Sequence, residues 1–111
     1  RQSVLDRDRL RDIFGDDSAG LAKILDVAAE SFTRLCRALE AAVSEADALG
    51  AAHELKGAAI NIGAVQICAA AQAIEARLKA GETLDHVRPS FGVVNAALQR
   101  FKDMVASSRD L

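Results

Sequence analysis

The amino-acid sequence predicts an all-α fold, an antiparallel up-down-up-down four-helix bundle with a short extra N-terminal helix. Apolar residues recur every three or four positions over most of the 111 residues, which is the spacing of amphipathic helices. Alanine is frequent, tryptophan and tyrosine are absent, and proline occurs once, a mix that disfavours sheets and favours closely packed helices. The connections between periodic stretches are short, so consecutive helices are expected to lie antiparallel.

Composition and charge predict a soluble single domain over residues 1–111. Half of the residues are hydrophobic and 27% are charged, enough apolar residues for one core. The formal net charge of −2 gives no excess of positive charge that would attract nucleic acid. No apolar run approaches the roughly 18 residues of a membrane-spanning helix, and no signal peptide is visible. We therefore expect a cytoplasmic domain without nucleic-acid or membrane contacts.

The first two helices are predicted on either side of an acidic turn. Residues 4–14 form the first, with Asp6 as its expected N-cap and Gly15 as its end. Residues 18–43 form the second. Its apolar stripe consists of Leu21, Ile24, Leu25, Ala28, Phe32, Leu35, Leu39 and Val43.

The third helix is expected to begin after Ser44, a good N-cap residue, and to run to about Ile62 before Gly63. On a helical wheel of about 100° per residue, small and apolar residues gather on the side opposite His53. The predicted core face consists of Ala51, Leu55, Ala58 and Ile62, flanked by Ala48 and Ala59. His53 is therefore predicted to point into solvent.

The last two helices are expected over residues 65–79, with Gly81 as the stop, and over residues 84–107. Pro89 lies in the opening turns of the final helix. Proline costs little free energy only in the first turn of a helix. The pattern therefore leaves open whether this helix starts before Pro89 or is interrupted there.

The neighbours of His53 suggest that its exposure has a purpose. Gly57 costs about 1 kcal/mol relative to alanine in a helix interior, and it lies one turn after His53, where a side chain would crowd the imidazole. Gly50 widens the opening on the other side. Lys56 also lies one turn away, close enough to pair with anionic oxygens on a group attached to the ring.

Two apolar residues share this exposed face. Leu49 and Ile60 are predicted to be partly exposed beside His53, which is typical of a surface that docks a partner. We expect the docking surface to include Leu49, Lys56 and Ile60. The alternative is that His53 is an incidental surface residue.

A solvent-exposed imidazole can act as a phosphoryl carrier. Its reference pKa of about 6.5 leaves much of it neutral and nucleophilic at pH 7, and a ring nitrogen can attack phosphorus to form a labile phosphoramidate. Lys56 would offset the added negative charge. The sequence contains no phosphate-binding glycine loop, so the domain is not expected to phosphorylate itself from ATP. Any metal would have to come from the partner.

The two cysteines and the second histidine are not expected to react or to bind a metal. Cys36 and Cys68 lie in apolar helical runs and are interpreted as reduced core residues. His86, at the start of the last helix, is interpreted as a surface or end-capping residue. Neither His53 nor His86 has cysteine or carboxylate companions at metal-ligand spacing, so no metal site is expected.

The sequence around His53 resembles the histidine-containing phosphotransfer (HPt) domain of multistep two-component phosphorelays. That family's pattern is His-x-Leu-Lys-Gly, then small residues, then glycine ten positions after the histidine. The matching positions in this chain are His53, Leu55, Lys56, Gly57, Ala58, Ala59, Gly63 and Ala64.

The resemblance implies a role for each motif residue. His53 would accept a phosphoryl group from the phospho-aspartate of a receiver domain and pass it to another receiver. Lys56 would assist electrostatically, Gly57 would clear room for docking, and Gly63 would permit the turn between the two motif helices. Partners would be receiver domains of response regulators or of a hybrid histidine kinase. The domain would be a monomer without a cofactor, and Mg²⁺ would be held by the partner receiver.

The chain departs from the family pattern at three positions. Many members carry glutamine 22 residues after the histidine, where this chain has Glu75. An ionised carboxylate cannot donate a hydrogen bond, so Glu75 is left out of the predicted site, and its i,i+4 pair with Lys79 is interpreted as solvated. Ala58 and Ala59 replace residues that are often serine in the family.

Two other functions stay open. The chain could be a helical interaction or dimerisation module whose exposed histidine does no chemistry. It could also be the phosphotransfer domain of a chemotaxis-type kinase, which receives its phosphoryl group from an ATP-binding domain of the same protein. The phosphotransfer domain could be part of a hybrid sensor kinase or a separate shuttle protein. The first residue is Arg1 rather than Met, which favours a domain cut from a larger protein. Whether such a carrier counts as an enzyme is left open.

Overall fold

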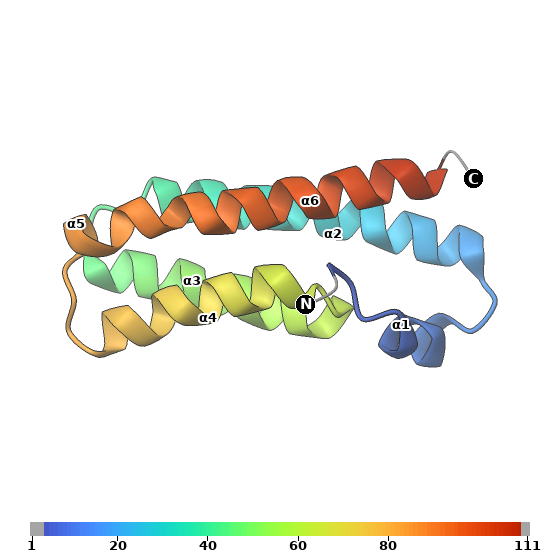
Figure 1. Ribbon diagram of the computed structural model, residues 1–111, viewed down its shortest axis with the longest axis horizontal. Coiled ribbons are helices and arrows are strands. Elements are labelled where there is room, and N and C mark those ends of the chain that lie inside the picture. Colours follow the sequence, from blue (N-terminus) through green and yellow to red (C-terminus); the bar gives the residue numbers. More distant parts are fainter. Residues whose placement is uncertain (1–3, 110–111) are drawn as a thin grey trace.

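The computed structural model describes residues 4–109, which contain helices and turns and no strand. This confirms the predicted all-α class. No helix in this range is both long and apolar enough to span a membrane. The elements, labelled in Figure 1, are α1 (Arg7–Phe14), α2 (Ser18–Glu40), α3 (Glu45–Ile62), α4 (Val65–Lys79), α5 (Leu84–Val87), the 3₁₀ turn η1 (Arg88–Ser90) and α6 (Phe91–Arg109).

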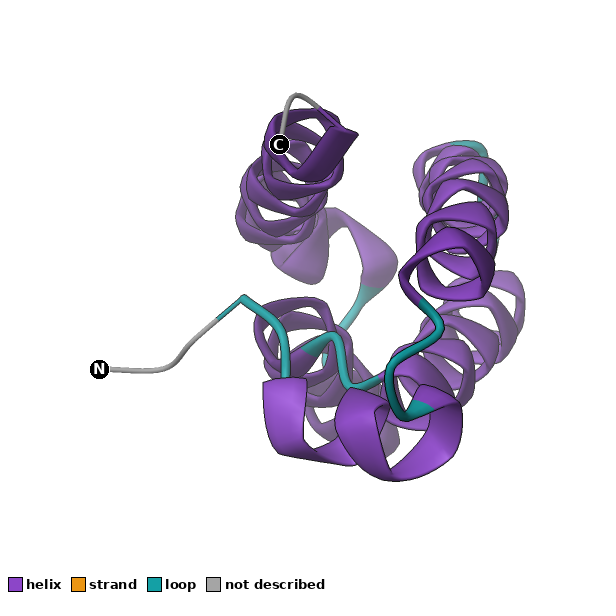
Figure 2. Cartoon of the chain, turned by 90° about the vertical axis from the view of Figure 1, so that its right-hand side faces the viewer, coloured by secondary structure: helices purple, strands orange, loops and turns teal. Residues whose placement is uncertain are grey.

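Four long helices form the body of an elongated molecule measuring 45 × 23 × 21 Å. Helix α2 packs against α3 and α6, and α4 packs against the same two helices. The colours of Figure 1 show the chain reversing direction from each long helix to the next, and Figure 2 looks along the helices from the end that carries α1. Each long helix therefore buries one side against two neighbours.

Local capping chemistry sets most helix boundaries. The side chains of Asp6, Asp17, Ser44 and Thr83 accept hydrogen bonds from backbone N–H groups three residues later, at the starts of α1, α2, α3 and α5. Such caps satisfy donors that have no partner within the helix. The predicted caps Asp6 and Ser44 are thus confirmed.

Helix α1 begins at Arg7, three residues later than predicted. The preceding segment is held by the turn between α3 and α4 instead. The backbone N–H of Asp6 donates to the carbonyl oxygen of Gly63 at 2.7 Å, and the N–H of Val65 donates to that of Val4 at 3.2 Å. Backbone groups engaged in these bonds are not available to a helix.

Helix α2 ends at Glu40 rather than at residue 43. The guanidinium of Arg88 donates to the carbonyl oxygens of Glu40 and Ala42, at 3.2 and 3.1 Å. The last carbonyl of the helix and one just beyond it therefore find a side-chain partner 46 to 48 residues away in sequence. Val43, predicted to belong to the apolar stripe, is 87% exposed.

The final predicted helix is interrupted at Pro89. Residues 84–107 divide into α5, the turn η1 that contains Pro89, and α6. Proline has no N–H to donate and disturbs the helix around it. The break lets Leu84 and Val87 pack into the core on one side and Phe91 on the other.

The core lies between the four long helices. Its centre contains Phe32 of α2 and Phe101 of α6, whose rings meet edge to face with centroids 5.1 Å apart. The buried face of α3 is turned slightly from the predicted one, because Ala52 is buried, whereas Ala51 and Ala58 are only partly so. The buried residues of α3 are Ala48, Ala52, Leu55, Ala59 and Ile62.

Candidate functional site

His53 meets helix α4 because small residues let α3 and α4 approach closely. Ala52 and Ala59 of α3 and Ala71 of α4 are fully buried. Alanine has little bulk to hold two backbones apart and is also the best helix former. This seam brings Glu75 of α4 opposite His53, although the two residues are 22 positions apart in sequence.

His53 is exposed on one edge and held on the other. Its side chain is 67% exposed, as the sequence predicted, while Nδ1 lies 2.6 Å from Oε2 of Glu75. An ionised carboxylate can only accept hydrogen bonds, which assigns the proton of a neutral imidazole to Nδ1. The lone pair then lies on Nε2. Glu75 thus fixes both the orientation of the ring and the tautomer that a nucleophile needs.

Glu75 is a buried carboxylate that contacts two lysines in addition to His53. It is 3% exposed. Its Oε1 accepts a hydrogen bond from Nζ of Lys56 at 2.5 Å, and Nζ of Lys79 lies 3.6 Å from Oε2. The hydrogen bonds from Lys56 and His53 outweigh burial and, with the positive charges of Lys56 and Lys79, lower the pKa of Glu75 from 4.5 to about 2. Glu75 is therefore ionised at neutral pH.

The interpretation of Glu75 as half of a solvated pair was wrong. Glu75 belongs to the site, and it acts as an acceptor rather than as the donor that a glutamine could supply. A signal was present in the sequence. Glu75 lies four residues after Ala71 and three before Leu78, both buried, so it interrupts the apolar face of α4. A carboxylate at such a position calls for cationic partners.

Lys56 and Gly57 lie where the sequence placed them, one turn after His53. The side chain of Lys56 is 23% exposed and its ammonium is bound to Glu75, so in this state Lys56 reaches the site through the carboxylate. A Cβ atom at Gly57 would meet nothing within 4 Å. The expectation that a side chain there would crowd the imidazole thus fails for a methyl group, and the space beside Gly57 is open to solvent.

The two predicted apolar docking residues differ in exposure. Ile60 is 48% exposed. Leu49 is only partly exposed and packs against the core. On the exposed face of α3, Ile60 therefore offers the larger apolar surface to a partner.

The other histidine and the cysteines lie outside this cluster. The side chain of His86 is 70% exposed, with Nδ1 3.2 Å from Oε1 of Glu82 at the start of α5. Cys36 is buried, which raises the pKa of its thiol to about 11, and Cys68 is partly exposed. Among the residues described, no group of three or more His, Cys, Asp or Glu side chains is placed to hold a metal ion.

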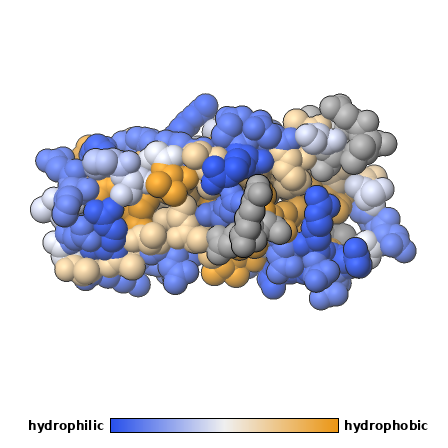
Figure 3. All heavy atoms as spheres, in the orientation of Figure 1, coloured by the Kyte–Doolittle hydropathy of each residue, from blue (hydrophilic) through white to orange (hydrophobic). Residues whose placement is uncertain are grey.

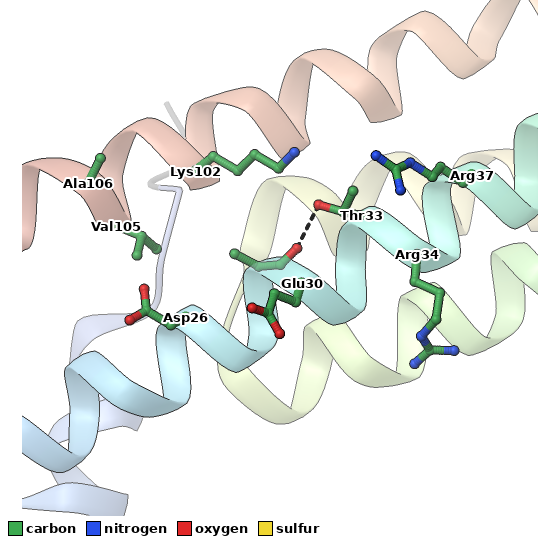
Figure 4. A pocket seen from close by; sticks show the side chains of 9 residues that line it. Asp26, Glu30, Thr33, Arg34, Arg37, Lys102, Val105 and Ala106 are labelled. Carbon is green, nitrogen blue, oxygen red and sulfur yellow. Dashed lines mark hydrogen bonds between the residues drawn. The ribbon is translucent and has the colours of Figure 1, made fainter.

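A surface hollow lies away from His53, between α2 and α6. It has a cavity volume of about 660 Å³. Figure 4 shows Arg37 of α2 and Lys102 of α6 beside Thr33, whose hydroxyl donates to the carbonyl oxygen of Ala29 at 2.7 Å. None of its lining residues belongs to the cluster around His53. Size alone does not make it the functional site, because its lining contains no histidine whose tautomer is fixed as that of His53 is.

The depressed pKa of Glu75 predicts a loss of stability in acid. Because the pKa of Glu75 in the folded state is about 2, against an ordinary value of 4.5, the ionised carboxylate stabilises the fold fully above about pH 4.5, and this contribution disappears as the pH falls toward 2. Urea unfolding of the wild type and of Glu75→Gln, followed from pH 5.5 to 2, should give a free-energy difference that shrinks over this window. Glu54→Gln, at an exposed residue of α3, is the control and should differ little from wild type throughout. A difference for Glu75→Gln that does not vary with pH would contradict the assignment.

The chain is similar to a known protein family. The family model described as the Hpt domain matches residues 19–109, which is most of the chain and runs from the second residue of α2 to the end of α6, without α1. Neither the curated proteins nor the solved structures gave a match.

Proposed function

The chain belongs to the Hpt domain family, and we propose that it is a phosphorelay module in which His53 accepts a phosphoryl group from a receiver-domain aspartate and passes it to the aspartate of another receiver. The observation that carries this proposal is the bond between Nδ1 of His53 and the buried carboxylate of Glu75. It holds an exposed imidazole with its nucleophilic nitrogen toward solvent, where a partner can reach it.

The proposed transfer forms one bond and breaks another. The Nε2 lone pair attacks the phosphorus of an aspartyl phosphate, and the bond from phosphorus to the carboxylate oxygen breaks, so that the aspartate leaves with the electron pair. The proton stays on Nδ1. The phosphorylated ring therefore carries a positive charge, which the carboxylate of Glu75 stabilises at 2.6 Å. The return transfer to a second aspartate is the reverse of this step.

The lysines balance the charges around this reaction. Lys56 and Lys79 bring two positive charges to a site that contains one carboxylate, so the site can receive a phosphoryl group without a net excess of negative charge. Lys79 is 61% exposed along its side chain and can turn toward phosphoryl oxygens. We expect Mg²⁺ to be held by the receiver.

The proposal includes the assembly expected from the sequence. The domain is a monomer in the cytoplasm, either as part of a hybrid sensor kinase or as a separate shuttle. Its partners are receiver domains of response regulators or of such a kinase. The proposal also includes the up-down-up-down arrangement of the bundle, supported by the pairings of α2, α3, α4 and α6 and the reversals visible in Figure 1.

A comparison of phosphoryl donors tests the proposal. The purified domain is mixed either with radiolabelled phospho-receivers or with the ATP-binding domain of a chemotaxis-type kinase and labelled ATP. Fast labelling by a phospho-receiver, with return of the label to a second receiver, is expected. Labelling only by the kinase domain would favour the chemotaxis-type alternative. No labelling by either would leave the domain as an interaction module.

Gly57→Ala is expected to stabilise the fold and to slow transfer. The added methyl group meets nothing within 4 Å in the free domain, so the helix should gain about 0.5–1 kcal/mol in free energy of unfolding. In the complex the same methyl would occupy space meant for the receiver and slow transfer roughly tenfold. Urea unfolding and transfer kinetics measure the two effects. Gly92→Ala, at an equally open helical glycine of α6, should leave transfer unchanged. A wild-type transfer rate in Gly57→Ala would show that the glycine does not serve docking.

A further inference from the structure

The hollow between α2 and α6 has the size of a small-molecule site. Its cavity volume of about 660 Å³ lies within the range of roughly 300–1,000 Å³ that is usual for ligand pockets. We call it the α2–α6 hollow and define it by six of the residues that line it, which are Ala29, Glu30, Arg37, Lys102, Val105 and Ala106. Figure 3, drawn in the orientation of Figure 1, shows hydrophobic residues beside hydrophilic ones along α6. The hollow thus lies on a surface of mixed polarity.

Two cations face each other at one end of the α2–α6 hollow. Figure 4 shows the guanidinium of Arg37 and the ammonium of Lys102 pointing toward one another, from α2 and α6, beside Thr33. Arg34, the third cation of the lining, points away from them and donates to Oγ of Ser31 at 3.3 Å. Neither Arg37 nor Lys102 forms an ion pair with a carboxylate in the described residues 4–109. Like charges repel one another, so an anionic group between these two cations would be held by both.

Lys102 lies against the core rather than extending fully into solvent. It is only partly exposed, whereas Arg37 is exposed. Burial raises the pKa of the Cys36 thiol to about 11, and the positive charge of Lys102 is near enough to oppose that rise. A partly buried ammonium loses part of its hydration, which makes a direct anionic partner worth more than it would be in water. This end of the hollow therefore favours an anion.

The floor beside these cations is apolar. Val105 is buried, Ala29 is partly exposed and Ala106 is exposed, and all three line the hollow. Their side chains are small, so they leave room for an aliphatic group over them. Such a group would remove apolar surface from water, both its own and that of the floor. A ligand for this hollow therefore combines an anionic head with an apolar body.

The opposite end of the hollow is acidic. Figure 4 shows the carboxylates of Asp26 and Glu30 on one side of Thr33 and the guanidinium of Arg37 on the other. Glu30 precedes Arg37 by seven residues, which is two turns or about 10 Å along α2. A second anionic group at that distance from the first would meet like charges. The hollow therefore selects against a ligand that is anionic at both ends.

We propose that the α2–α6 hollow binds a small amphiphilic monocarboxylate. Its carboxylate lies between Arg37 and Lys102, where the guanidinium can donate two parallel hydrogen bonds and the ammonium adds a second positive charge. Its aliphatic chain lies over the apolar floor, and its uncharged end reaches Glu30. The ligand contacts both α2 and α6 and so stabilises the bundle by mass action. This site is separate from His53, and the proposal does not rest on phosphoryl transfer.

Titration with octanoate, below the concentration at which it forms micelles, tests the site. In nitrogen-15 NMR spectra we expect saturable shifts of the backbone amides of Ala29, Thr33 and Ala106, and thermal unfolding should move to higher temperature as octanoate is added. Octanedioate, with a carboxylate at each end, should bind roughly tenfold more weakly. Octylamine, which has the same chain and the opposite charge, should give no saturable shift. Equal affinity for octanoate and octanedioate, or shifts spread over the whole surface, would overturn the proposal.

Variants that remove one charge examine the two ends of the hollow separately. Arg37→Gln and Lys102→Gln should each raise the dissociation constant for octanoate roughly fivefold, because each removes one cation from the head group. Lys23→Gln is the matched control, since Lys23 is an exposed cation of α2 that does not line the hollow. Glu30→Gln should strengthen the binding of octanedioate and leave that of octanoate nearly unchanged. An unchanged affinity for octanoate in both Arg37→Gln and Lys102→Gln would rule the site out.

Filling the hollow gives an independent readout. Ala106 is exposed at its rim, so Ala106→Phe should block octanoate without disturbing the core, whereas Ala73→Phe, at an exposed residue of α4 outside the hollow, should not. Both variants should be labelled by a phospho-receiver as the wild type is. Octanoate binding retained in Ala106→Phe would place the ligand elsewhere and overturn the hollow. Octanoate binding in a domain that no phospho-receiver labels would support the hollow and refute the relay function alone.

Discussion

Replacement of His53 by Gln is expected to abolish labelling of the domain by a phosphorylated receiver. Glutamine is polar and of similar length, but its amide nitrogen has no free lone pair with which to attack phosphorus. The fold should tolerate the change, because the His53 side chain is 67% exposed. The glutamine amide can also donate to Oε2 of Glu75 in place of Nδ1, so the buried carboxylate keeps a partner on that side. The loss should therefore be chemical rather than structural.

The measurement follows radiolabel from a phospho-receiver onto wild type, His53→Gln and His86→Gln. The wild type and His86→Gln should carry a label that is labile in acid and stable in base, as expected of a phosphoramidate. His53→Gln should carry none, and its circular dichroism should match that of the wild type. Equal labelling of His53→Gln would move the acceptor to His86, the only other histidine in the sequence. If none of the three proteins is labelled although all of them bind the receiver, the interaction module would be favoured.

The helices could be predicted because their signals are local. Ser44 and Gly63 mark the ends of α3 through their own backbone and side-chain chemistry, and both ends were predicted correctly. The end of α2 could not be, because it depends on Arg88, which contacts Glu40 from 48 residues away. Periodicity carried the prediction on to Val43, which is exposed. Sequence patterns record local preference, whereas this boundary is decided by tertiary contact.

The same distinction between local signals and tertiary contacts applies to the residues of the site. His53 and Lys56 lie within one turn of a single helix, so their proximity follows from helical geometry alone. Glu75 lies on the next helix, and its position opposite His53 depends on how closely α3 and α4 pack. The sequence prediction compared Glu75 with the glutamine of many family members, which can donate a hydrogen bond, and therefore left Glu75 out of the site. Its burial and its two short contacts show that the site needs an acceptor.

Removal of the Glu75 side chain is expected to slow phosphoryl transfer more than any other change that keeps His53. Glu75→Ala removes the acceptor that assigns the proton to Nδ1, so both tautomers should be populated and the ring should turn more freely. The partners that orient metal-binding histidines are typically worth roughly 10- to 100-fold, and by analogy we expect a loss of about that size in kcat from a saturating phospho-receiver. Glu75→Gln should lose less, because its carbonyl oxygen can still accept from Nδ1, although its NH₂ group cannot accept the hydrogen bond that Lys56 donates to Glu75.

A positioning role and a merely structural role make different predictions for these two variants. Nitrogen-15 NMR of the His53 ring reports the tautomer directly, and the wild type should show a protonated Nδ1 and a lone pair on Nε2. If Glu75 acts through the ring, the loss in kcat should follow the change in tautomer, with Glu75→Gln intermediate and Glu75→Ala lowest. If Glu75 serves only the fold, the loss should instead follow the free energy of unfolding and should disappear at low temperature, where both variants are folded. Glu54→Gln, which removes an exposed carboxylate from α3, should change neither the ring spectrum nor the rate. A folded Glu75→Ala with an altered tautomer and a wild-type kcat would show that the buried carboxylate does not assist the nucleophile.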